Sequence, residues 1–297
     1  MTDYPVDMSV HPDIASFFDP GTNTISHVAI DPSTRTCAIY DSVLDIDYAS
    51  GRLAHGHADT LIAFVREQRL KLEWLIETHV HADHLSAAPY IQERLGGRIG
   101  IGAKIVEVQE TFGKVFNEGT AFQRDGSQFD RLFEDGDTYS VGSLTGFAIH
   151  TPGHTPACMT HVLGDAAFVG DTLFMPDGGT ARADFPGGDA GQLYDSIQKV
   201  LSLPEAMRLF MCHDYGPNGR EIRWETTVGE EKARNIHVGT AAEGRDRDGF
   251  VRLRTERDRT LAMPRLILPS IQVNMRGGHM PTGDDGKPVL KVPIDAL

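Results

Sequence analysis

The sequence predicts a layered α/β protein in which helices cover mixed β-sheets. β-like runs alternate with helical patterns along most of the 297 residues, which is typical of sheets covered by helices. A turn motif joins two of the early β-like runs, so neighbouring strands are antiparallel in at least one place. With 40% hydrophobic and 24% charged residues, the composition is that of a soluble globular protein with a sizeable core.

The first predicted elements are a hairpin, a helix and a strand. Residues 27–30 and 36–40 are β-like, and the Asp-Pro-Ser-Thr run at 31–34 between them has the composition of a turn. In residues 59–69 apolar side chains recur at i, i+3 and i+4, which predicts an amphipathic helix. Residues 72–77 are mostly apolar and predict a strand.

The strand at 72–77 leads into a dense group of metal-binding side chains. The run Thr78-His79-Val80-His81-Ala82-Asp83-His84 places three imidazoles and a carboxylate within six positions. So many donors are hard to desolvate without a cation, and the combination suits zinc, iron or another first-row transition metal. Residues 85–95 predict the helix that leaves this motif, and Gly96-Gly97 ends it.

The remaining predicted elements continue the alternation. They are a helix at 103–116, strands at 140–150, 160–163 and 166–169, a helix at 190–201 and a strand at 208–211. From about residue 216 the chain becomes more polar, with helices predicted at 221–235 and 250–262 and a tail rich in Pro and Gly from residue 264. A cap that contacts substrate and a surface for forming a homo-oligomer are both compatible with this extension.

Three further fragments supply ligands of the right chemical type. Each follows a predicted strand, and the ends of strands are where loops gather functional groups. The fragments are Thr151-Pro152-Gly153-His154-Thr155, Gly170-Asp171-Thr172 and Cys212-His213-Asp214-Tyr215. Together with the motif that begins at residue 78, they predict a metal centre assembled from four strand ends.

Charge and composition exclude several other classes of function. The formal net charge is −14 and no Lys/Arg cluster dominates, which argues against a nucleic-acid surface and favours a small-molecule substrate. The N-terminus lacks the pattern of a secretion signal and no run approaches the ~20 apolar residues of a membrane span, so we expect a cytoplasmic protein with no membrane partner.

The three cysteines agree with that location. They are widely spaced and odd in number, which suits a reducing compartment better than a disulfide framework. We expect Cys37 and Cys212 to be buried as small hydrophobic side chains. Cys158 stands four residues after His154, so we expect it near the pocket.

In their order along the chain, the motifs resemble those of the metallo-β-lactamase superfamily. The resemblance covers roughly residues 25–215 and rests on His79-x-His81-x-Asp83-His84, Gly153-His154, Gly170-Asp171 and His213. It implies an αββα sandwich with mixed sheets and the metal at one edge. We therefore expect residues 1–297 to form a single metallo-β-lactamase-like domain, with its core at about 25–215 and a C-terminal extension at about 216–297.

Within the superfamily, the chain looks most like the persulfide dioxygenase branch, which is related to glyoxalase II. The pointers are the motif at 78–84, residues 151–156 with Cys158 close behind, Ala181-Arg182-Ala183-Asp184-Phe185 and Cys212-His213-Asp214-Tyr215; the segment 211–224 is similar to bacterial β-lactamase hydrolase-like proteins. This resemblance implies oxidation of glutathione persulfide by dioxygen to sulfite and glutathione, a reaction of sulfide detoxification. A fused or separate sulfur transferase would then be the partner that supplies the persulfide.

By motif position, the resemblance assigns His79, His154 and Asp171 as the ligands of one Fe(II) per chain. Two histidines and one carboxylate leave coordination positions open for sulfur and dioxygen. The other donors of the motifs are His81, Asp83, His84 and His213. In a dioxygenase these four orient the ligands and tune the metal, whereas in a dinuclear hydrolase of the glyoxalase II type they complete two zinc sites that generate a bridging hydroxide for thioester cleavage.

The sequence leaves both of these alternatives open. A third alternative is a metal-stabilised binding module without turnover, but a structural site normally closes its coordination sphere and this set leaves positions free. Apart from metal ligands, no catalytic residue is assigned.

Four further residues are candidate substrate contacts. Arg182, with Asp184, forms either an internal ion pair that braces the metal loop or a pair that helps to bind a thiol substrate. Tyr215 either faces the pocket or only caps a strand end. Arg220 and Arg223 either meet the carboxylates of a glutathione-like ligand or lie on a solvated face.

Overall fold

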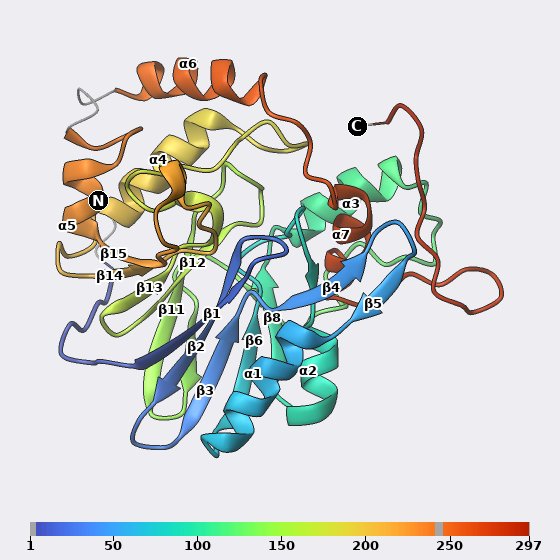
Figure 1. Cartoon of the computed structure of the whole chain (residues 1–297), viewed down its shortest axis with the longest axis horizontal. Coiled ribbons are helices and arrows are strands. Elements are labelled where there is room, and N and C mark those ends of the chain that lie inside the picture. Colours follow the sequence, from blue (N-terminus) through green and yellow to red (C-terminus); the bar gives the residue numbers. More distant parts are fainter. Residues whose placement is uncertain (1–3, 241–245, 297) are drawn as a thin grey trace.

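The computed structural model describes residues 4–240 and 246–296, and its centre is a pair of six-stranded mixed sheets packed face to face (Figure 1). In the first sheet the order is β1-β2-β3-β6-β8-β9, and in the second it is β10-β11-β12-β13-β14-β15. The first sheet consists of β1 (Asp13–Asp19), β2 (Thr24–Asp31), β3 (Thr36–Tyr40), β6 (Lys71–Ile76), β8 (Arg98–Gly102) and β9 (Arg131–Phe133).

The second sheet is antiparallel except for one neighbouring pair, β13 and β14, which run parallel. Its strands are β10 (Thr138–Val141), β11 (Leu144–His150), β12 (Met159–Leu163), β13 (Ala166–Phe168), β14 (Arg208–Phe210) and β15 (Glu225–Thr227). A small third sheet has the order β5-β4-β7, with β4 (Val43–Asp47), β5 (Arg52–Ala54) and β7 (Leu85–Ser86).

Helices cover the outer faces of both large sheets. The first sheet packs against α1 (Gly56–Glu67), α2 (Ala88–Leu95) and α3 (Ile105–Val115), whose buried apolar side chains belong to one core with those of β2, β3 and β6. On the other side, α4 (Ala190–Leu201) packs against the second sheet, and α6 (Arg247–Asp258) lies over α4 (Figure 1). This is the predicted αββα arrangement.

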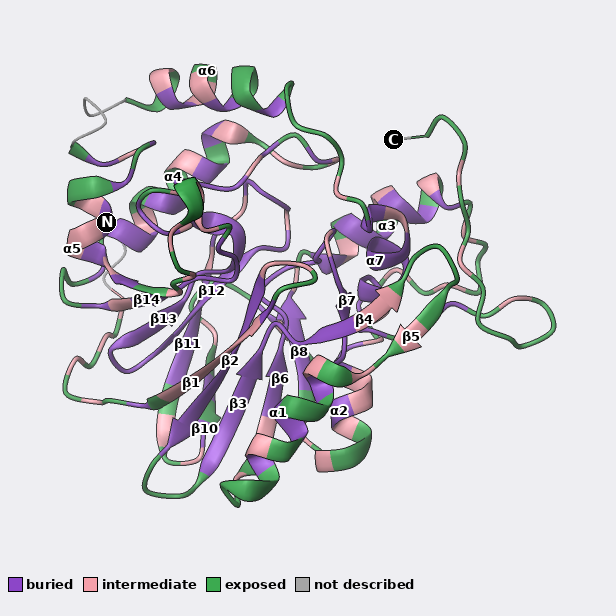
Figure 2. Cartoon of the chain, viewed as in Figure 1, coloured by how far each residue is buried: buried purple, intermediate pink, exposed green. Residues whose placement is uncertain are grey.

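Strand β3 shows how the sequence separates the two cores. Its five residues are all buried, because both faces of the strand are covered (Figure 2). Side chains alternate along a strand, so Cys37 and Ile39 face the helices while Ala38 and Tyr40 face the second sheet. A β-bulge where β3 pairs with β6 shifts this alternation, which places Trp74 of β6 between the sheets.

Most predicted elements are confirmed. The hairpin predicted at 27–40 is β2 and β3, and their register is antiparallel. The helix predicted at 190–201 is α4, with Asp189 as its N-cap. Some boundaries differ. The helix predicted at 59–69 is α1, which begins at Gly56, and the helix predicted at 85–95 begins at Ala88, because Leu85 and Ser86 pair with β4 instead.

The C-terminal extension differs more from its prediction. The helix predicted at 221–235 is wrong in its first half, since Glu225–Thr227 pairs with β14 at the edge of the second sheet and α5 (Val228–Arg234) begins only after it. The helix predicted at 250–262 is α6, shifted towards the N-terminus. The tail predicted from residue 264 contains α7 (Ile267–Asn274), in which Pro269 stands in the first turn, where its missing N–H costs no hydrogen bond.

Among residues 4–240 and 246–296, none of the helices has the length and apolar character needed to cross a membrane.

Candidate metal centre

The structure brings the predicted donors together at one edge of the sandwich. The motif at 78–84 follows β6, His154 follows β11, Asp171 lies in a 3-10 turn after β13, and His213 follows β14. All seven donor side chains are buried except that of Asp83, which is 27% exposed. They fall into two of the groups of His, Cys, Asp and Glu side chains whose potential ligand atoms lie within 4.8 Å of one another.

The first group consists of His79, His154 and Asp171. Asp171 Oδ2 lies 3.6 Å from His154 Nε2 and 4.0 Å from His79 Nε2. Two ligands that bind one ion at about 2.1 Å each lie roughly 3–4 Å apart. The spacing of the first group therefore fits a shared metal ion.

The second group consists of His81, Asp83, His84 and His213. Asp83 Oδ2 lies 3.4 Å from His213 Nε2 and 3.5 Å from His84 Nδ1. Asp171 connects the two groups, because its other oxygen, Oδ1, lies 3.5 Å from His213 Nε2. This carboxylate is placed where a ligand shared by two ions would be.

Lone pairs left without partners point to a cation. Among the residues that the structure describes, several buried nitrogen and oxygen atoms of the two groups have no hydrogen-bond partner. Burying a polar atom without a partner costs folding free energy. These atoms are His79 Nε2, His81 Nδ1, Asp83 Oδ2, His84 Nε2, Asp171 Oδ1 and His213 Nε2. The residues present therefore fit a bound metal.

Hydrogen bonds hold the histidines of the first group in the tautomer that a metal requires. The backbone oxygen of Arg182 can only accept, so His154 Nδ1 donates to it at 2.8 Å and leaves Nε2 unprotonated. The Thr78 hydroxyl donates to Asp41 and therefore accepts from His79 Nδ1 at 3.0 Å, which leaves His79 Nε2 unprotonated too. Burial and the neighbouring imidazoles lower the pKa of His79, so the neutral ligand form is favoured.

Carboxylates, by contrast, surround His81 of the second group. His81 Nε2 lies 2.9 Å from Asp41 Oδ1 and 3.3 Å from Glu77 Oε2, so it donates, and Nδ1 is the atom that can bind a metal once its proton has been released. Burial alone would lower the pKa of His81, but Asp41 and Glu77 outweigh it and raise this pKa. Asp83 and Asp171 likewise raise the pKa of His213 against the effect of burial.

Helix α7 holds the backbone of the motif at 78–84 through hydrogen bonds from one residue. Asn274 Nδ2 donates to the backbone oxygens of His81 at 2.9 Å and His84 at 2.8 Å, and its Oδ1 accepts from Ser86 N at 2.8 Å. Sequence reasoning missed this residue, as it missed Asp41. A signal existed only for Asp41, a carboxylate directly after a predicted strand.

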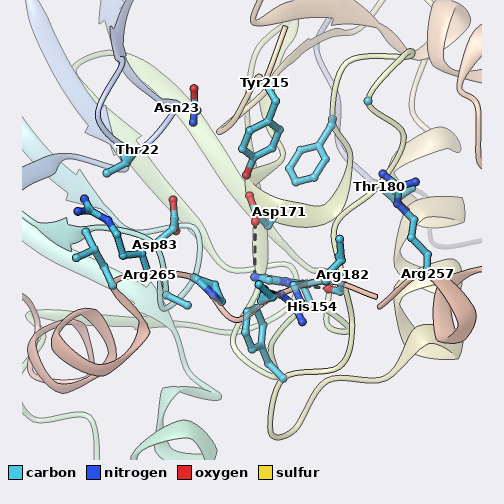
Figure 3. A pocket seen from close by; sticks show the side chains of 18 of the residues that line it. Thr22, Asn23, Asp83, His154, Asp171, Thr180, Arg182, Tyr215, Arg257 and Arg265 are labelled. Carbon is cyan, nitrogen blue, oxygen red and sulfur yellow. Dashed lines mark hydrogen bonds and ion pairs between the residues drawn. The ribbon is translucent and has the colours of Figure 1, made fainter. Parts of the chain in front are cut away.

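A pocket of about 520 Å³ opens beside the donors (Figure 3). Asp83, His154 and Asp171 line its metal-facing part, while Phe174 and Phe185 contribute apolar wall. The rest of the wall comes from residues 21–23, from residues 178–182, from Tyr215 and from the C-terminal extension between Arg254 and Leu266. The extension thus lines part of the pocket, and its contact with substrate stays a prediction.

Arg182 and Tyr215 line this pocket, and their contact with substrate stays a prediction. The guanidinium of Arg182 is occupied, since Nε and Nη2 donate to Asp184 and Nη1 donates to the backbone oxygen of Ala262. Arg182 therefore forms the internal ion pair with Asp184 and also lines the pocket. Figure 3 shows the Tyr215 hydroxyl pointing toward Asp171. Desolvation, together with the Asp171 charge, raises the pKa of Tyr215, so the hydroxyl is protonated at neutral pH.

The other two predicted substrate contacts lie outside the pocket lining. The Arg220 guanidinium donates to both Asp177 and Asp214, which leaves it little capacity for a substrate carboxylate. Arg223 donates its backbone N–H to Asp214. For these two arginines, substrate binding stays a prediction that the geometry does not favour.

The cysteines are buried, as predicted for Cys37 and Cys212. Cys158 is also buried and is absent from the pocket lining, although it lies close to His154 in sequence. Its sulfur accepts from the backbone N–H of Thr155, and burial raises the pKa of its thiol to about 12. Cys158 is therefore a protonated thiol behind the pocket wall.

Comparison with known families agrees with this arrangement. Residues 25–213 match the family described as Metallo-beta-lactamase superfamily. The chain belongs to the metallo-β-lactamase superfamily. The fold and the resemblance predicted from the sequence are confirmed, and an enzyme of this superfamily with a His/Asp metal-binding cluster is the coarse identity that follows.

Relatives within the superfamily carry different names. A probable metallo-hydrolase of Burkholderia pseudomallei is 57% identical, over 96% of this chain and 99% of its own. Glyoxylase B2 of Dictyostelium discoideum is 47% identical, over 91% of this chain and 92% of its own. The mitochondrial persulfide dioxygenase ETHE1 of Bos taurus is 29% identical, over 89% of this chain and 88% of its own. Among solved structures, ETHE1 from Myxococcus xanthus is similar with a TM-score of 0.71 and 28% identity, covering 90% of this chain and 100% of that one.

Proposed function

We propose that this metallo-β-lactamase superfamily protein is a persulfide dioxygenase that uses one Fe(II), held by His79, His154 and Asp171. The observation that carries the proposal is this group of two histidines and one carboxylate, both histidines being held in the ligand tautomer. Such a set leaves coordination positions open, as non-haem iron oxygenases require. Similarity to ETHE1 proteins across about nine tenths of the chain supports the proposal.

The proposed reaction balances without a further oxidant. One dioxygen and one water convert glutathione persulfide into glutathione, sulfite and two protons. The terminal sulfur gives up four electrons, dioxygen takes them up, and the sulfur–sulfur bond breaks. Bound iron would supply the redox chemistry that couples sulfur to dioxygen. We propose that a sulfur transferase supplies the persulfide.

The protein's own residues position the substrate and limit water. Thr78 and the Arg182 backbone oxygen orient the two histidines, and Phe174 and Phe185 place apolar surface beside the donors. The Tyr215 hydroxyl is protonated at neutral pH and points toward Asp171. It is therefore placed to donate a hydrogen bond to the sulfur or to the sulfite that leaves.

A dinuclear zinc thioester hydrolase is the second candidate. The observation that favours it is the second donor group, together with the position of Asp171 between the two groups. In such an enzyme two zinc ions activate a hydroxide that attacks the thioester carbonyl carbon. The names of the Burkholderia pseudomallei and Dictyostelium discoideum relatives also suit this candidate.

Metal analysis combined with two assays tests the proposal. Protein purified without oxygen and loaded with ferrous iron is expected to hold one iron per chain, to consume one dioxygen per glutathione persulfide and to release sulfite. The same preparation and a zinc-loaded one are given S-lactoylglutathione as the matched thioester. Two zinc ions per chain with thioester cleavage, and no oxygen uptake from the iron form, would replace the first candidate by the second.

A further inference from the structure

The turn between β1 and β2 contacts two histidines of the second donor group. The backbone oxygen of Asn23 lies 3.2 Å from His213 Nδ1, and Thr24 Oγ1 lies 3.3 Å from His84 Nδ1. Thr24 also forms an isolated β-bridge with His213, and both Thr24 and His84 are fully buried. Two of the four donors of this group therefore rest on one short segment, which is far from both of them in sequence.

A chain of hydroxyl groups fixes the direction of the bond to His84. Thr22 Oγ1 donates to Asp19 Oδ2 at 2.6 Å, so it accepts from Thr24 Oγ1 at 2.8 Å, because a hydroxyl has only one proton. Thr24 has then given its own proton to Thr22 and accepts from His84 Nδ1. The carboxylate at the end of the chain thus determines the tautomer of the neutral His84 imidazole: Nδ1 carries the proton and Nε2 keeps its lone pair.

The same turn orients His213 through its backbone. A carbonyl oxygen can only accept, so the Asn23 oxygen receives the Nδ1 proton of His213. Within the part of the chain that the structure describes, Nε2 of His213 and Nε2 of His84 have no hydrogen-bond partner. Both imidazoles therefore keep on Nε2 a lone pair that a cation can bind.

The first donor group is organised in the same way. There the Thr78 hydroxyl accepts from His79 Nδ1 and donates to Asp41. In each group a carboxylate, acting through one or two threonine hydroxyls, sets the tautomer of a histidine. Hydrogen bonds of this kind behind a ligand change metal affinity by roughly 10–100-fold when they are removed.

Asp83 does not replace the threonine as the acceptor for His84. Asp83 Oδ2 lies 3.5 Å from His84 Nδ1, but it makes no hydrogen bond to any residue that the structure describes, and it also lies 3.4 Å from His213 Nε2. Asp83 is itself a candidate ligand, so a cation in the second group would occupy its carboxylate. Thr24 then remains as the acceptor for the Nδ1 proton.

Asp19 also holds the backbone of the turn. Its Oδ2 accepts from the backbone N–H of Thr22 at 2.9 Å. Asn23 has a φ of 58°, in the left-handed region that asparagine adopts more readily than most residues. Residues 21–23 line the pocket, as does Asp83 (Figure 3). One buried carboxylate thus supports both the hydroxyl chain and the backbone oxygen that orients His213.

We propose that Asp19, Thr22 and Thr24 are positioning residues that prepare the second donor group to bind a divalent transition-metal ion, by holding His84 with Nε2 free. The inference goes beyond the proposed function, because it concerns the donor group that a single iron leaves free. Zinc is a suitable probe, since it binds imidazole and carboxylate ligands and has no redox chemistry of its own.

Zinc binding at pH 8, measured in competition with a chromophoric chelator, tests the assignment. The unchanged protein is expected to bind two zinc ions per chain. Thr24→Val keeps the shape of the side chain and removes the hydroxyl, so one zinc ion should bind roughly tenfold more weakly while the other keeps its affinity. Thr24→Ser restores the hydroxyl and should restore the affinity.

Thr22→Val tests the chain one step further from the metal. Thr22 is only half-buried, so the change should be tolerated by the fold. It frees the Thr24 hydroxyl to donate to His84 Nδ1, and a smaller loss of affinity for the same zinc ion is expected. Thr36→Val is the matched control, because Thr36 is a buried threonine at the end of β3 opposite to Asp41. Thermal unfolding and iron content show whether each variant has folded.

NMR separates positioning from a general loss of structure. In the zinc-saturated protein, the proton on His84 Nδ1 is identified by its absence from His84→Gln. Its resonance should shift in Thr24→Val, because the proton has lost its acceptor, and should stay in place in Thr24→Ser and Thr36→Val. A resonance that is unchanged in Thr24→Val would show that Thr24 is not the acceptor.

The inference is overturned if the unchanged protein binds only one zinc ion in excess zinc. It is also overturned if Thr24→Val and Thr22→Val bind both zinc ions as tightly as Thr36→Val. Oxygen uptake tests the proposed function separately. If the iron-loaded protein consumes no oxygen with glutathione persulfide while zinc affinity follows the hydroxyl of residue 24, the dioxygenase proposal fails and the positioning role stands.

Discussion

The two donor groups of the metal centre contain similar ligands but have different surroundings. In the first group, uncharged oxygen atoms accept the Nδ1 protons of His79 and His154. In the second group, two carboxylates face His81 and raise its pKa. His79 is therefore ready to bind a metal as a neutral imidazole, whereas His81 must first release a proton. The atoms behind the ligands, and not the ligand types, distinguish the two groups.

Removing a ligand of the first group has the largest expected effect. His79→Ala, His154→Ala or Asp171→Ala should each abolish iron binding and oxygen uptake together, because each removes one of three protein ligands. Iron per chain and dioxygen consumption with glutathione persulfide are the measurements. His279→Ala, at an exposed position, is the control. A variant of the first group that kept full iron and turnover would show that its assignment as a ligand is wrong.

Ligands of the second group should matter less if only the first group holds a metal. His84→Ala and His213→Ala are expected to keep most of the iron while turnover falls, since these side chains would only orient the site. The number of metal ions per chain is measured in the unchanged protein and in both variants. Loss of one metal from a measured pair in either variant would make the two groups equivalent and would favour the hydrolase candidate.

Asn274 tests whether the second group depends on support from α7. Asn274→Ala should leave the backbone oxygens of His81 and His84 buried without donors, at a cost of roughly 1–3 kcal/mol for each unpaired group. Thermal unfolding and metal affinity measure the effect. Asn274→Asp is a second variant, which retains an acceptor for Ser86, loses the donors and adds a negative charge beside the two backbone oxygens, so it should destabilise the protein more than Asn274→Ala does. If both variants unfold and bind metal like the unchanged protein, the support is unimportant.

Acid should release metal from the two groups at different pH values. Protons compete with metal for imidazole, so the raised pKa of His81 means that zinc bound at the second group leaves at a higher pH than zinc at the first. Glu77→Gln removes one carboxylate and should lower the pH of release from the second group by roughly one unit. Zinc per chain is measured as the pH falls from 8. A single release step at the same pH in both proteins would contradict this difference.

The smallest expected effect is at Cys158. Its thiol is buried, with a pKa raised to about 12, so it is no nucleophile at neutral pH. Cys158→Ser should keep its iron and measurable oxygen uptake, because chemistry at either donor group needs no protein thiol. Complete loss of turnover in a folded, iron-loaded variant would show that the thiol takes part covalently and would require a different mechanism.

Most helices and the donor side chains that meet at the metal centre could be predicted from the sequence because their signals are local. The boundaries of α4 were predicted to the residue, since its apolar period begins after the N-cap Asp189 and ends before Pro204. The candidate ligands were recognisable as short motifs at strand ends. Strand β15 was missed because it forms only by pairing with the edge of β14, a contact between segments that no local pattern shows.

The residues that surround the ligands were not predictable for the same reason. Asn274 looks like one polar residue near a Pro- and Gly-rich tail, and its role depends on a loop far away in sequence. Arg257 and Arg265 look like members of a charged, solvated segment. Only the folded chain shows that both line the pocket.

The position of Asn274 has a consequence for the order in which the protein folds. Its hydrogen bonds to Ser86, His84 and His81 join residues 188, 190 and 193 positions apart. Contacts of such sequence separation close large loops and form slowly. During synthesis on the ribosome, the backbone groups of His81, His84 and Ser86 lack these hydrogen bonds until residue 274 has been synthesised. Metal loading is therefore expected to be a late event in biogenesis, after the last helix has docked.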